Sequence, residues 1–403
     1  MQQPRNPVTL DDVAREAGVS RATVSRTLNG KASMVSEATK ARVRAVAEEL
    51  GYTTNLAAQA VAVGRSTSVG FVVDTIPDDY QSPLAASVFR MASRHQQIVL
   101  MAENDRGDLA KARRLVNRLR GYRPQMIFVA GSCSIDEPGM DGLLTELRSY
   151  EADGGRVVFI GQSGTPFDTV VVDDHRVGRD MARALHEVGY REFSVFSSGT
   201  DRSIGPTRMR GFVAGLLELG INLPPDRILY NDFSHRGGYR SAGELLGRRT
   251  ATEAVFCVSD SVAIGAVARL REAGVRVGPD LAIAGCDDLP ALRDIDPPLT
   301  TMRLPWQEVA EKAFDLANTA DRNDARTVTL RGHPVMRAST PGLPRQAPDE
   351  TEAGHADRSG HHRPRHNTAS RLLVEQCGFL EVREQWDDED GLDLIYEVSP
   401  TLR

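Results

Sequence analysis

The sequence lacks the features of membrane, secreted and metal-binding proteins. No run approaches about 18 apolar residues, and the N-terminus has no apolar signal-peptide core. No CxxC pair occurs, so neither a zinc site nor a disulfide framework is expected. The four cysteines lie far apart, at Cys133, Cys257, Cys286 and Cys377. These absences predict a cytoplasmic protein that does not enter a membrane.

The sequence also lacks the short motifs of common enzyme classes. It contains no P-loop, no GxGxxG after a predicted strand, no HExxH and no GxSxG. Nothing in the sequence fixes a metal-binding geometry for the histidines near the C-terminus, which are His355, His361, His362 and His366. We therefore expect no enzyme activity, no metal and no cofactor.

Length and charge indicate more than one folding unit. A chain of 403 residues exceeds one ordinary hydrophobic core, so two or three units are expected. Residues 1–66 hold nine Lys or Arg against six Asp or Glu, a net charge of +3. The whole chain has a net charge of -6, which leaves -9 for the remainder. A small basic unit on an acidic body is typical of a DNA-binding unit attached to another domain.

The first 50 residues contain start and stop signals for three short helices. Thr9 with Asp12 forms a capping-box pattern, and a glycine follows the helix. The second helix is expected at 21–28 and the third from Glu37 to about Leu50. The remaining signals are, in chain order, Gly18, Ser20, Asn29-Gly30 and Ser36. Two short helices joined by a tight glycine turn and backed by a third form a helix-turn-helix.

The second helix is expected to contact DNA. In a helix-turn-helix this helix lies in the major groove. Val24 and Leu28, four residues apart, should face the small core, which turns the polar side outward. Arginine can bond guanine bidentately, alanine can pack on a thymine methyl, and hydroxyls suit phosphates. The outward residues are Arg21, Ala22, Ser25 and Arg26, and Thr23 and Ser25 suit phosphate contacts. The alternative is a surface helix with two solvated arginines.

The N-terminal stretch resembles a known family. VTLDDVAREAGVSRATVSRTLNG, followed by VSEATKARVRAVAEELGY, is similar almost residue by residue to the DNA-binding unit of the lactose-repressor (LacI/GalR) family of transcription regulators. The resemblance implies a repressor that binds double-stranded operator DNA of pseudo-palindromic sequence as a homodimer, or as a tetramer. The implied DNA contacts in this unit are Thr9, Ser20, Arg21, Ala22, Thr23, Ser25, Arg26 and Asn29.

The resemblance also implies a hinge helix at 55–64 that inserts an apolar side chain into the minor groove. The implied contacts are Asn55, Gln59 and Val61, with Val61 at the wedge position that usually holds leucine. Parting two stacked base pairs costs on the order of a few kcal/mol. The shorter valine therefore predicts a shallower kink or a wedge shared with a neighbour. A plain linker helix is the alternative.

From Val69 onward, short apolar runs alternate with amphipathic stretches. The predicted strands are 69–74, 98–102, 126–130, 157–160, 193–197, 228–231, 255–259 and 281–286. The predicted helices are 84–95, 109–120, 140–152, 176–188, 207–219, 237–246 and 261–273. This alternation predicts parallel sheets covered on both faces. Eight strands divide into two lobes with a seam near 161–167, and a ligand would bind between them at the carboxyl ends of the strands.

To about Pro341 the body resembles the periplasmic-binding-protein type of effector domain. The patches VVVDDHRVG, TRMRGF, VFCVSDSVAIGA, and LAIAGCDDLP followed by PPLTTMRLP carry this looser resemblance. It implies a crossover back to the first lobe at 297–320 and a last strand ending at 337–340. The expected fold is an N-terminal all-α helix-turn-helix plus a two-lobed α/β periplasmic-binding-protein-like domain of type I.

This organisation sets the expected domain boundaries. The helix-turn-helix is expected at 1–53 and the hinge helix and linker at 54–66. Effector binding and dimerisation are assigned to 67–340. Residues 341–403 are expected to form a disordered linker and a short extension, in which 372–398 could be a small hairpin or helix, or could have no function.

The resemblance, carried over position by position, implies an effector site for a sugar or related polyol. Arg208 matches an effector-binding arginine, and Asp287 matches a carboxylate that receives ligand hydroxyls, although Asp288 is an alternative one residue away. An arginine and an aspartate can bracket a polyol while aromatic rings cover its C–H face. The other implied contacts are Asp74, Tyr80, Phe233, Ser259 and Trp306. The alternative is that Arg208 is an ordinary surface arginine and that Phe233 and Trp306 are aromatic residues of the core.

Three positions depart from the family pattern. Ser259 replaces a frequent asparagine, Leu304 a frequent glutamine, and Cys286 a frequent aromatic residue. The site therefore loses amide groups and a ring, which favours a smaller or more apolar ligand than a hexose. A solute-binding protein without a DNA role is the alternative function. It would need a signal peptide or lipid anchor and no helix-turn-helix.

Overall fold

The computed structural model describes most of the chain. The described residues are 8–28, 35–53, 66–74, 81–104, 108–131, 137–161, 164–199, 204–248, 251–319, 324–343, 379–387 and 391–398. They contain no helix that is both long and apolar enough to cross a bilayer. The chain divides into two compact units, each described by itself below. One comprises 1–173, 200–204 and 304–332, and the other 174–199, 205–303 and 333–403.

Three short helices form at the N-terminus: α1 (Leu10–Glu16), α2 (Arg21–Leu28) and α3 (Glu37–Glu49). The capping box is confirmed, because Asp12 N–H donates to Thr9 Oγ1 at 3.3 Å while Thr9 N–H donates to Asp12 Oδ2 at 3.0 Å. Gly18 then takes a positive φ of 63°. At this turn Val19 N–H donates to the carbonyl of Ala14 at 3.1 Å, which is the Schellman ending that glycine permits.

The same ending recurs after α3, and the three helices share one core. Gly51 has a φ of 66°, and Tyr52 N–H donates to the carbonyl of Ala47 at 2.8 Å. The buried side chains are Val13, Ala14, Ala17, Val24, Val43 and Ala47, with Leu28, Val46 and Leu50 packed against them. The predicted helix-turn-helix is therefore confirmed, with Thr9, Gly18, Ser20 and Ser36 at the helix ends for which the sequence nominates them. The nominated end of α2, Asn29-Gly30, lies outside the described residues.

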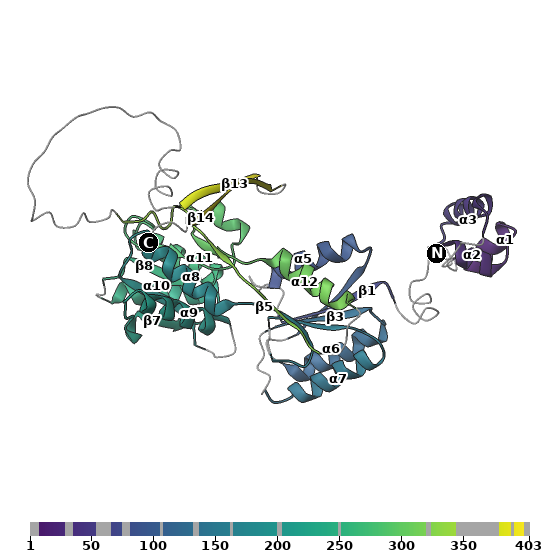
Figure 1. The fold of residues 1–403 in the computed structure, drawn as a ribbon, viewed down its shortest axis with the longest axis horizontal. Helices are drawn as coiled ribbons and strands as arrows, with labels where there is room; N and C mark the ends of the chain where they lie inside the picture. The colour runs from purple at the N-terminus through teal and green to yellow at the C-terminus, as the bar shows by residue number, and fades with distance from the viewer. Residues whose placement is uncertain are drawn as a thin grey trace, which may run out of the picture. The chain divides into compact units, whose positions relative to one another are not determined.

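The first unit contains a parallel six-stranded sheet in the order β11-β5-β4-β3-β1-β2. Its strands are β1 (Ser68–Val73), β2 (Ile98–Glu103), β3 (Met126–Ala130), β4 (Val157–Ile160), β5 (Asp168–Val172) and β11 (Thr327–Leu330). Figure 1 shows helices α5 (Gln81–Arg94) and α12 (Trp306–Asn318) on one face of this sheet, and α6 (Leu109–Gly121) and α7 (Met140–Ala152) on the other. The predicted double covering is confirmed.

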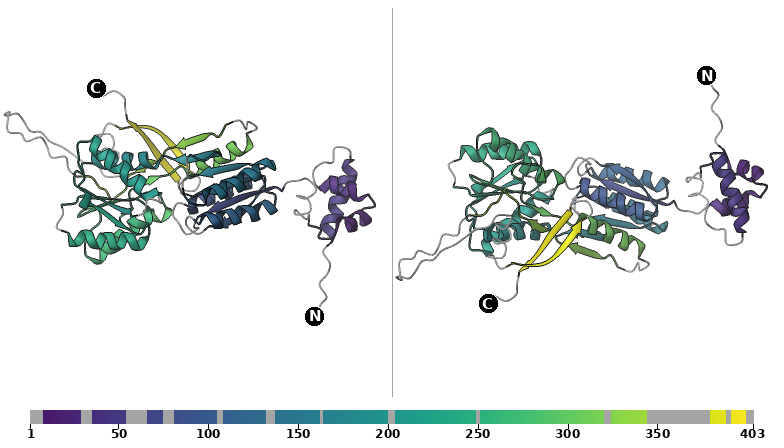
Figure 2. Two further views of the ribbon diagram at one scale, coloured as in Figure 1. Left: turned by 90° about the horizontal axis from the view of Figure 1, so that it is seen from below. Right: turned by 90° about the horizontal axis from the view of Figure 1, so that it is seen from above.

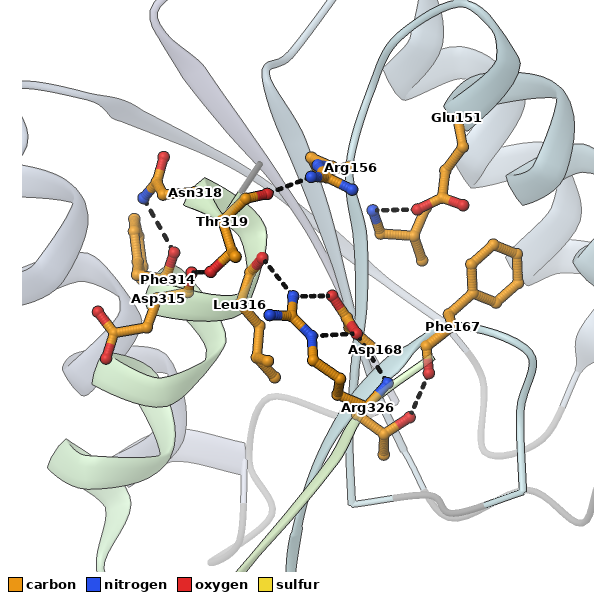
Figure 3. Close-up of polar contacts among 12 residues, drawn as sticks. Glu151, Arg156, Phe167, Asp168, Phe314, Asp315, Leu316, Asn318, Thr319 and Arg326 are labelled. Atoms are coloured by element: carbon orange, nitrogen blue, oxygen red, sulfur yellow. Dashed lines mark hydrogen bonds and ion pairs between the residues drawn. The ribbon is translucent and has the colours of Figure 1, made fainter. Parts of the chain in front are cut away.

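Two strands of this sheet, β5 and β11, were not predicted. β11 is a short edge strand whose apolar side chains merely alternate, so the sequence holds no apolar run there. Polar contacts fix it instead, as Figure 3 shows. Arg326 donates to Asp168 through Nε at 3.2 Å and through Nη2 at 2.7 Å, and Nη2 also donates to the carbonyl of Leu316. Because β5 pairs with β4, the predicted seam near 161–167 is wrong, and the boundary falls between Asp173 and Asp174.

The second unit contains a parallel four-stranded sheet in the order β7-β6-β8-β9. Its strands are β6 (Phe193–Ser198), β7 (Ile228–Asn231), β8 (Ala254–Cys257) and β9 (Ala282–Ala284). Its helices are α8 (Asp174–Glu187), α9 (Ile204–Glu218), α10 (His235–Gly247) and α11 (Asp260–Glu272), with 3-10 turns at Pro225–Arg227 and Pro290–Arg293. Stacked Phe212 and Phe256 join α9 to the sheet. Leu245 and Val262 of α10 and α11 belong to a core cluster with Val255.

The end of the body differs from the prediction. The last strand, β12 (His333–Val335), pairs with β10 (Thr301–Arg303) and stops before 337–340. The crossover segment that belongs to the first unit runs from Leu304 to Gly332. Farther on, β13 (Phe379–Asp387) and β14 (Gly391–Val398) form an antiparallel hairpin, visible in yellow in Figure 2. The hairpin is one of the alternatives that the sequence leaves open.

Candidate functional site

Helix α2 presents a polar face. Arg21, Ala22 and Arg26 are exposed, Thr23 and Ser25 are half-buried, and Val24 is buried. Thr27 is also buried, and its hydroxyl donates to the carbonyl of Thr23 at 2.8 Å. The expected outward residues thus share one side of a short helix, the arrangement with which a recognition helix meets base edges.

The residues at the start of α2 are already engaged with the protein. Ser20 Oγ accepts from Thr23 N–H at 3.2 Å and lies 2.9 Å from Thr23 Oγ1. Arg21 Nη1 lies 3.5 Å from Asp11 Oδ2 in an exposed ion pair. Exposed pairs of this kind contribute little. Ser20 therefore acts as the helix cap, and Arg21 can exchange its carboxylate partner for DNA at small cost.

Several nominated contacts lie outside the described residues. They are Asn29, Asn55, Gln59, Val61 and Tyr80, together with the four C-terminal histidines named above. Thr9 is described and exposed, and its side chain takes part in the capping box of α1.

In the second unit, Arg208 on α9 is fully buried among acidic groups. Its Nε donates to Asp174 Oδ1 at 2.8 Å, and its Nη1 lies 2.9 Å from Asp287 Oδ1. Nη1 also donates to the carbonyl of Val258 at 2.8 Å. Arg208 Nη2 is buried and has no hydrogen-bond partner among the residues that the structure describes. A buried donor without an acceptor costs about 1–3 kcal/mol, which marks Nη2 as a position for a ligand oxygen or nitrogen.

The acidic neighbours keep Arg208 charged. Burial by itself lowers the pKa of Arg208, but the negative charges around it, Asp287 foremost, raise that pKa well above its usual value. Burial also raises the pKa of the adjacent Cys286 thiol well above the ordinary range, so this side chain is a small neutral group. One cation between two carboxylates leaves the cluster with a net charge of about -1.

A glycine in α8 allows this arrangement. A Cβ at Gly178 would lie 1.9 Å from the carbonyl oxygen of Arg208 and 2.7 Å from the amide nitrogen of Phe212. Both atoms belong to α9, so any side chain at 178 would force the two helices apart. The close approach of α8 and α9 is what brings Asp174, at the first turn of α8, to Arg208.

The structure separates the roles of the two consecutive aspartates. Asp287 faces Arg208, whereas Asp288 accepts from Arg303 Nε at 2.7 Å and from Arg337 Nη2 at 2.6 Å. Asp287 and Asp288 have φ values of 125° and 56°, which non-glycine residues rarely adopt. Such strain persists only where the surroundings over-determine it. Of the two, Asp287 is the candidate for the ligand.

The remaining nominated residues of this unit are placed differently. Ser259 caps α11 by accepting from Val262 N–H at 3.3 Å, so its acceptor serves the helix; the predicted strand 255–259 correspondingly ends at Cys257. Phe233 is half-buried two residues after β7, and its ring borders Gly205, where a Cβ would lie 3.2 Å from Phe233 Cδ2. Phe233 therefore follows β7 at the same edge of the sheet at which Val258 follows β8 and Asp287 follows β9.

Asp74 and Trp306 belong to the first unit. Asp74 follows β1, and its carboxylate covers Gly131 at the end of β3, where a Cβ would lie 2.7 Å from Asp74 Oδ2. Trp306 is buried at the first position of α12. These residues therefore lie on a different unit from Arg208.

Two partners of Arg208 were not nominated from the sequence. Asp174 lies in the patch VVVDDHRVG, where two consecutive aspartates precede an amphipathic helix. That position at a helix start was the available signal, because acidic residues are favoured there. The carbonyl of Val258 carries no side-chain signal at all.

Comparison with known proteins agrees with this architecture. The family model described as bacterial regulatory proteins, lacI family, matches residues 9–55, and a periplasmic binding protein-like domain matches 182–340. The HTH-type transcriptional repressor PurR of Pectobacterium atrosepticum is 30% identical over 332 residues, which span 81% of this chain and 95% of that protein.

Solved structures show the same fold. The lac repressor dimer bound to operator and the anti-inducer ONPF has a TM-score of 0.71 at 24% identity and covers 83% of this chain and 99% of its own. The complex of the transcriptional regulator CelR with cellobiose has a TM-score of 0.59 at 28% identity, with 82% and 99% covered.

The helix-turn-helix, the two α/β units and these matches define the chain as a DNA-binding transcription regulator. It belongs to the lacI family of bacterial regulatory proteins. The family resemblance and the fold class expected from the sequence are thereby confirmed.

Proposed function

We propose that this chain is a repressor whose operator affinity is controlled by an uncharged small molecule bound at Arg208 and Asp287. It acts as a homodimer on a pseudo-palindromic operator in the cytoplasm, and it catalyses no reaction. Its relatives are named transcriptional repressors, and the lac repressor of like fold is described as a dimer bound to operator. Effector and operator then bind two states of the protein with different affinity.

The observation that carries the effector proposal is the buried Nη2 of Arg208. It offers its N–H groups to a ligand in a cluster that already holds two carboxylates. A net negative cluster disfavours phosphorylated or carboxylated ligands and accepts hydroxyl donors. A sugar, a polyol or a nucleoside has this chemistry.

Thermal shift with a defined panel tests the effector proposal. The panel pairs cellobiose, ribose and adenosine with ribose 5-phosphate and AMP. A bound compound raises the Tm by mass action. We expect a neutral member to raise the Tm of the wild type and to leave that of Arg208→Lys unchanged. An equal rise of the Tm in Arg208→Lys would show that Arg208 does not bind the compound. A rise of the Tm with the phosphorylated members alone would show that the ligand is not uncharged.

Arg26 tests the DNA-reading face. An operator duplex is first selected from a random library, and binding is then measured by fluorescence anisotropy. Arg26→Ala should weaken binding to this duplex by ~1–3 kcal/mol and relax the base preference at one position per half-site. Arg15→Ala is the matched control, because Arg15 is an exposed arginine of α1. Equal losses on selected and random DNA would show that Arg26 contacts only phosphate.

A further inference from the structure

Asp288 joins three segments of the second unit. Its side chain is 5% exposed, and each of its carboxylate oxygens accepts from a different arginine, Arg303 and Arg337. Arg337 is held further, since its Nη1 donates to the carbonyl of Leu299 at 2.8 Å and its backbone N–H donates to Thr300 Oγ1 at 2.7 Å. Asp288 is therefore the centre of a buried charge network rather than a surface residue.

The two arginines belong to the segments by which the chain leaves and re-enters this unit. The unit ends at Arg303 on the outgoing side and resumes at His333 on the returning side. Strands β10 and β12 pair antiparallel there, with Arg303 opposite His333. Arg337 follows β12 by two residues. Asp288 thus binds Arg303 at the end of β10 and Arg337 just after β12.

The neighbouring residue connects the same network to the arginine site. Asp287 faces Arg208, and its backbone N–H donates to the carbonyl of Met302 in β10 at 2.9 Å. The positive φ values of Asp287 and Asp288 leave the pair few other conformations. A change in the position of Asp287 therefore changes the position of Asp288.

We propose that Asp288 is the positioning residue that couples the Arg208–Asp287 site to both crossover segments, at Arg303 and at Arg337. Its role is to transmit the state of the site, without touching the effector or DNA. Asp287 reaches β10 directly through its backbone, and β10 pairs with β12. Asp288 adds a side-chain link, through Arg337, to the segment that follows β12. The inference rests on the proposed function only in taking the Arg208–Asp287 site as the effector site.

Hydrogen exchange on the full chain tests this coupling. Asp287→Asn removes the charge that faces Arg208 and so perturbs the site without a ligand. We expect it to raise amide exchange in 333–337 by about fivefold in the wild-type background and by less than about twofold in an Asp288→Asn background. Exchange near Arg208, in α9, should rise equally in both backgrounds. The same factor for 333–337 in both backgrounds would overturn the proposal.

Two further variants keep the test decisive. Asp280→Asn is the matched control, because it removes the carboxylate of an exposed arginine–aspartate pair in the same unit, and it should leave the exchange of 333–337 unchanged in both backgrounds. If Asp288→Asn does not fold, Arg337→Lys replaces it and should also suppress the effect of Asp287→Asn. Neither operator nor effector is used, so a failed ligand panel does not alter the outcome.

Discussion

Asp287 and Asp288 are consecutive, yet they belong to two buried clusters of opposite design. In one, a single arginine, Arg208, lies between Asp174 and Asp287. In the other, a single carboxylate, Asp288, lies between Arg303 and Arg337. Both oxygens of Asp288 accept hydrogen bonds, whereas Arg208 keeps one buried donor without an acceptor among the described residues. This difference supports our proposals that the Asp288 cluster holds segments of the chain together and that the Arg208 cluster binds the effector.

Burial acts against the charge in both clusters and is outweighed in both. It raises the pKa of Asp288, but hydrogen bonds from Arg303 and Arg337 bring that pKa below its usual value. It lowers the pKa of Arg208, and the surrounding carboxylates more than reverse that effect. Each centre is therefore ionised at neutral pH, and removing its charge leaves its partners uncompensated.

The largest effect is expected at Arg208. Arg208→Leu leaves Asp174 and Asp287 buried without their cation, and it should lower the free energy of unfolding by ~3–5 kcal/mol. Urea denaturation followed by far-UV circular dichroism measures this loss. For this reason Arg208→Lys, rather than an apolar variant, is used in the ligand panel.

The matched control for this change is Arg326→Leu in the first unit. Arg326 pairs with the single carboxylate of Asp168, and its side chain is 35% exposed, so water can replace part of the interaction. Arg326→Leu should therefore lower the free energy of unfolding by clearly less than Arg208→Leu does. If both variants lose the same free energy of unfolding, the burial of Arg208 between two carboxylates adds nothing to its contribution to stability.

Much of the fold could be predicted because its signals are local. Capping residues and the glycine after α1 fix the ends of the N-terminal helices, and both are visible in the sequence. The strands β3 and β4 are continuous apolar runs, and their predicted bounds are correct, as are those of β7. By contrast, β11 and β12 are short, partly exposed segments held by pairing to residues distant in sequence, which no local pattern reports.

The candidate site could be predicted only in part, for a similar reason. Arg208 and Asp287 were nominated through the family resemblance, and the structure brings them to 2.9 Å. Asp174 was missed because its contact depends on the close approach of α8 and α9 at Gly178. Ser259 was nominated for the ligand, but its position before α11 makes it a helix cap. Spatial convergence, rather than residue type, decided each of these cases.

A smaller effect with a distinctive pH dependence is expected at Asp288. Because the pKa of Asp288 is lowered in the folded chain, its charge adds stability above the ordinary aspartate pKa of about 3.9. That stability is lost as the pH falls through the lowered value. Asp288→Asn should therefore be less stable than the wild type by ~1–3 kcal/mol at pH 7, with a gap that narrows below about pH 4. Urea denaturation at a series of pH values measures it, and a gap that stays constant would assign the loss to packing.

The smallest effect is expected at Asp280, which forms an arginine–aspartate pair that is exposed rather than buried. Arg276 donates to Asp280 from its backbone N–H at 2.9 Å and from Nε at 3.0 Å, and the side-chain bond is the main reason that the pKa of Asp280 is lowered to about 2. Both side chains are exposed, so water and salt replace the interaction. Asp280→Asn should leave the urea midpoint unchanged in physiological salt. If Asp280→Asn loses as much free energy of unfolding as Asp288→Asn, an arginine–aspartate pair stabilises this unit whether it is exposed or buried. Burial would then not explain the contribution of Asp288.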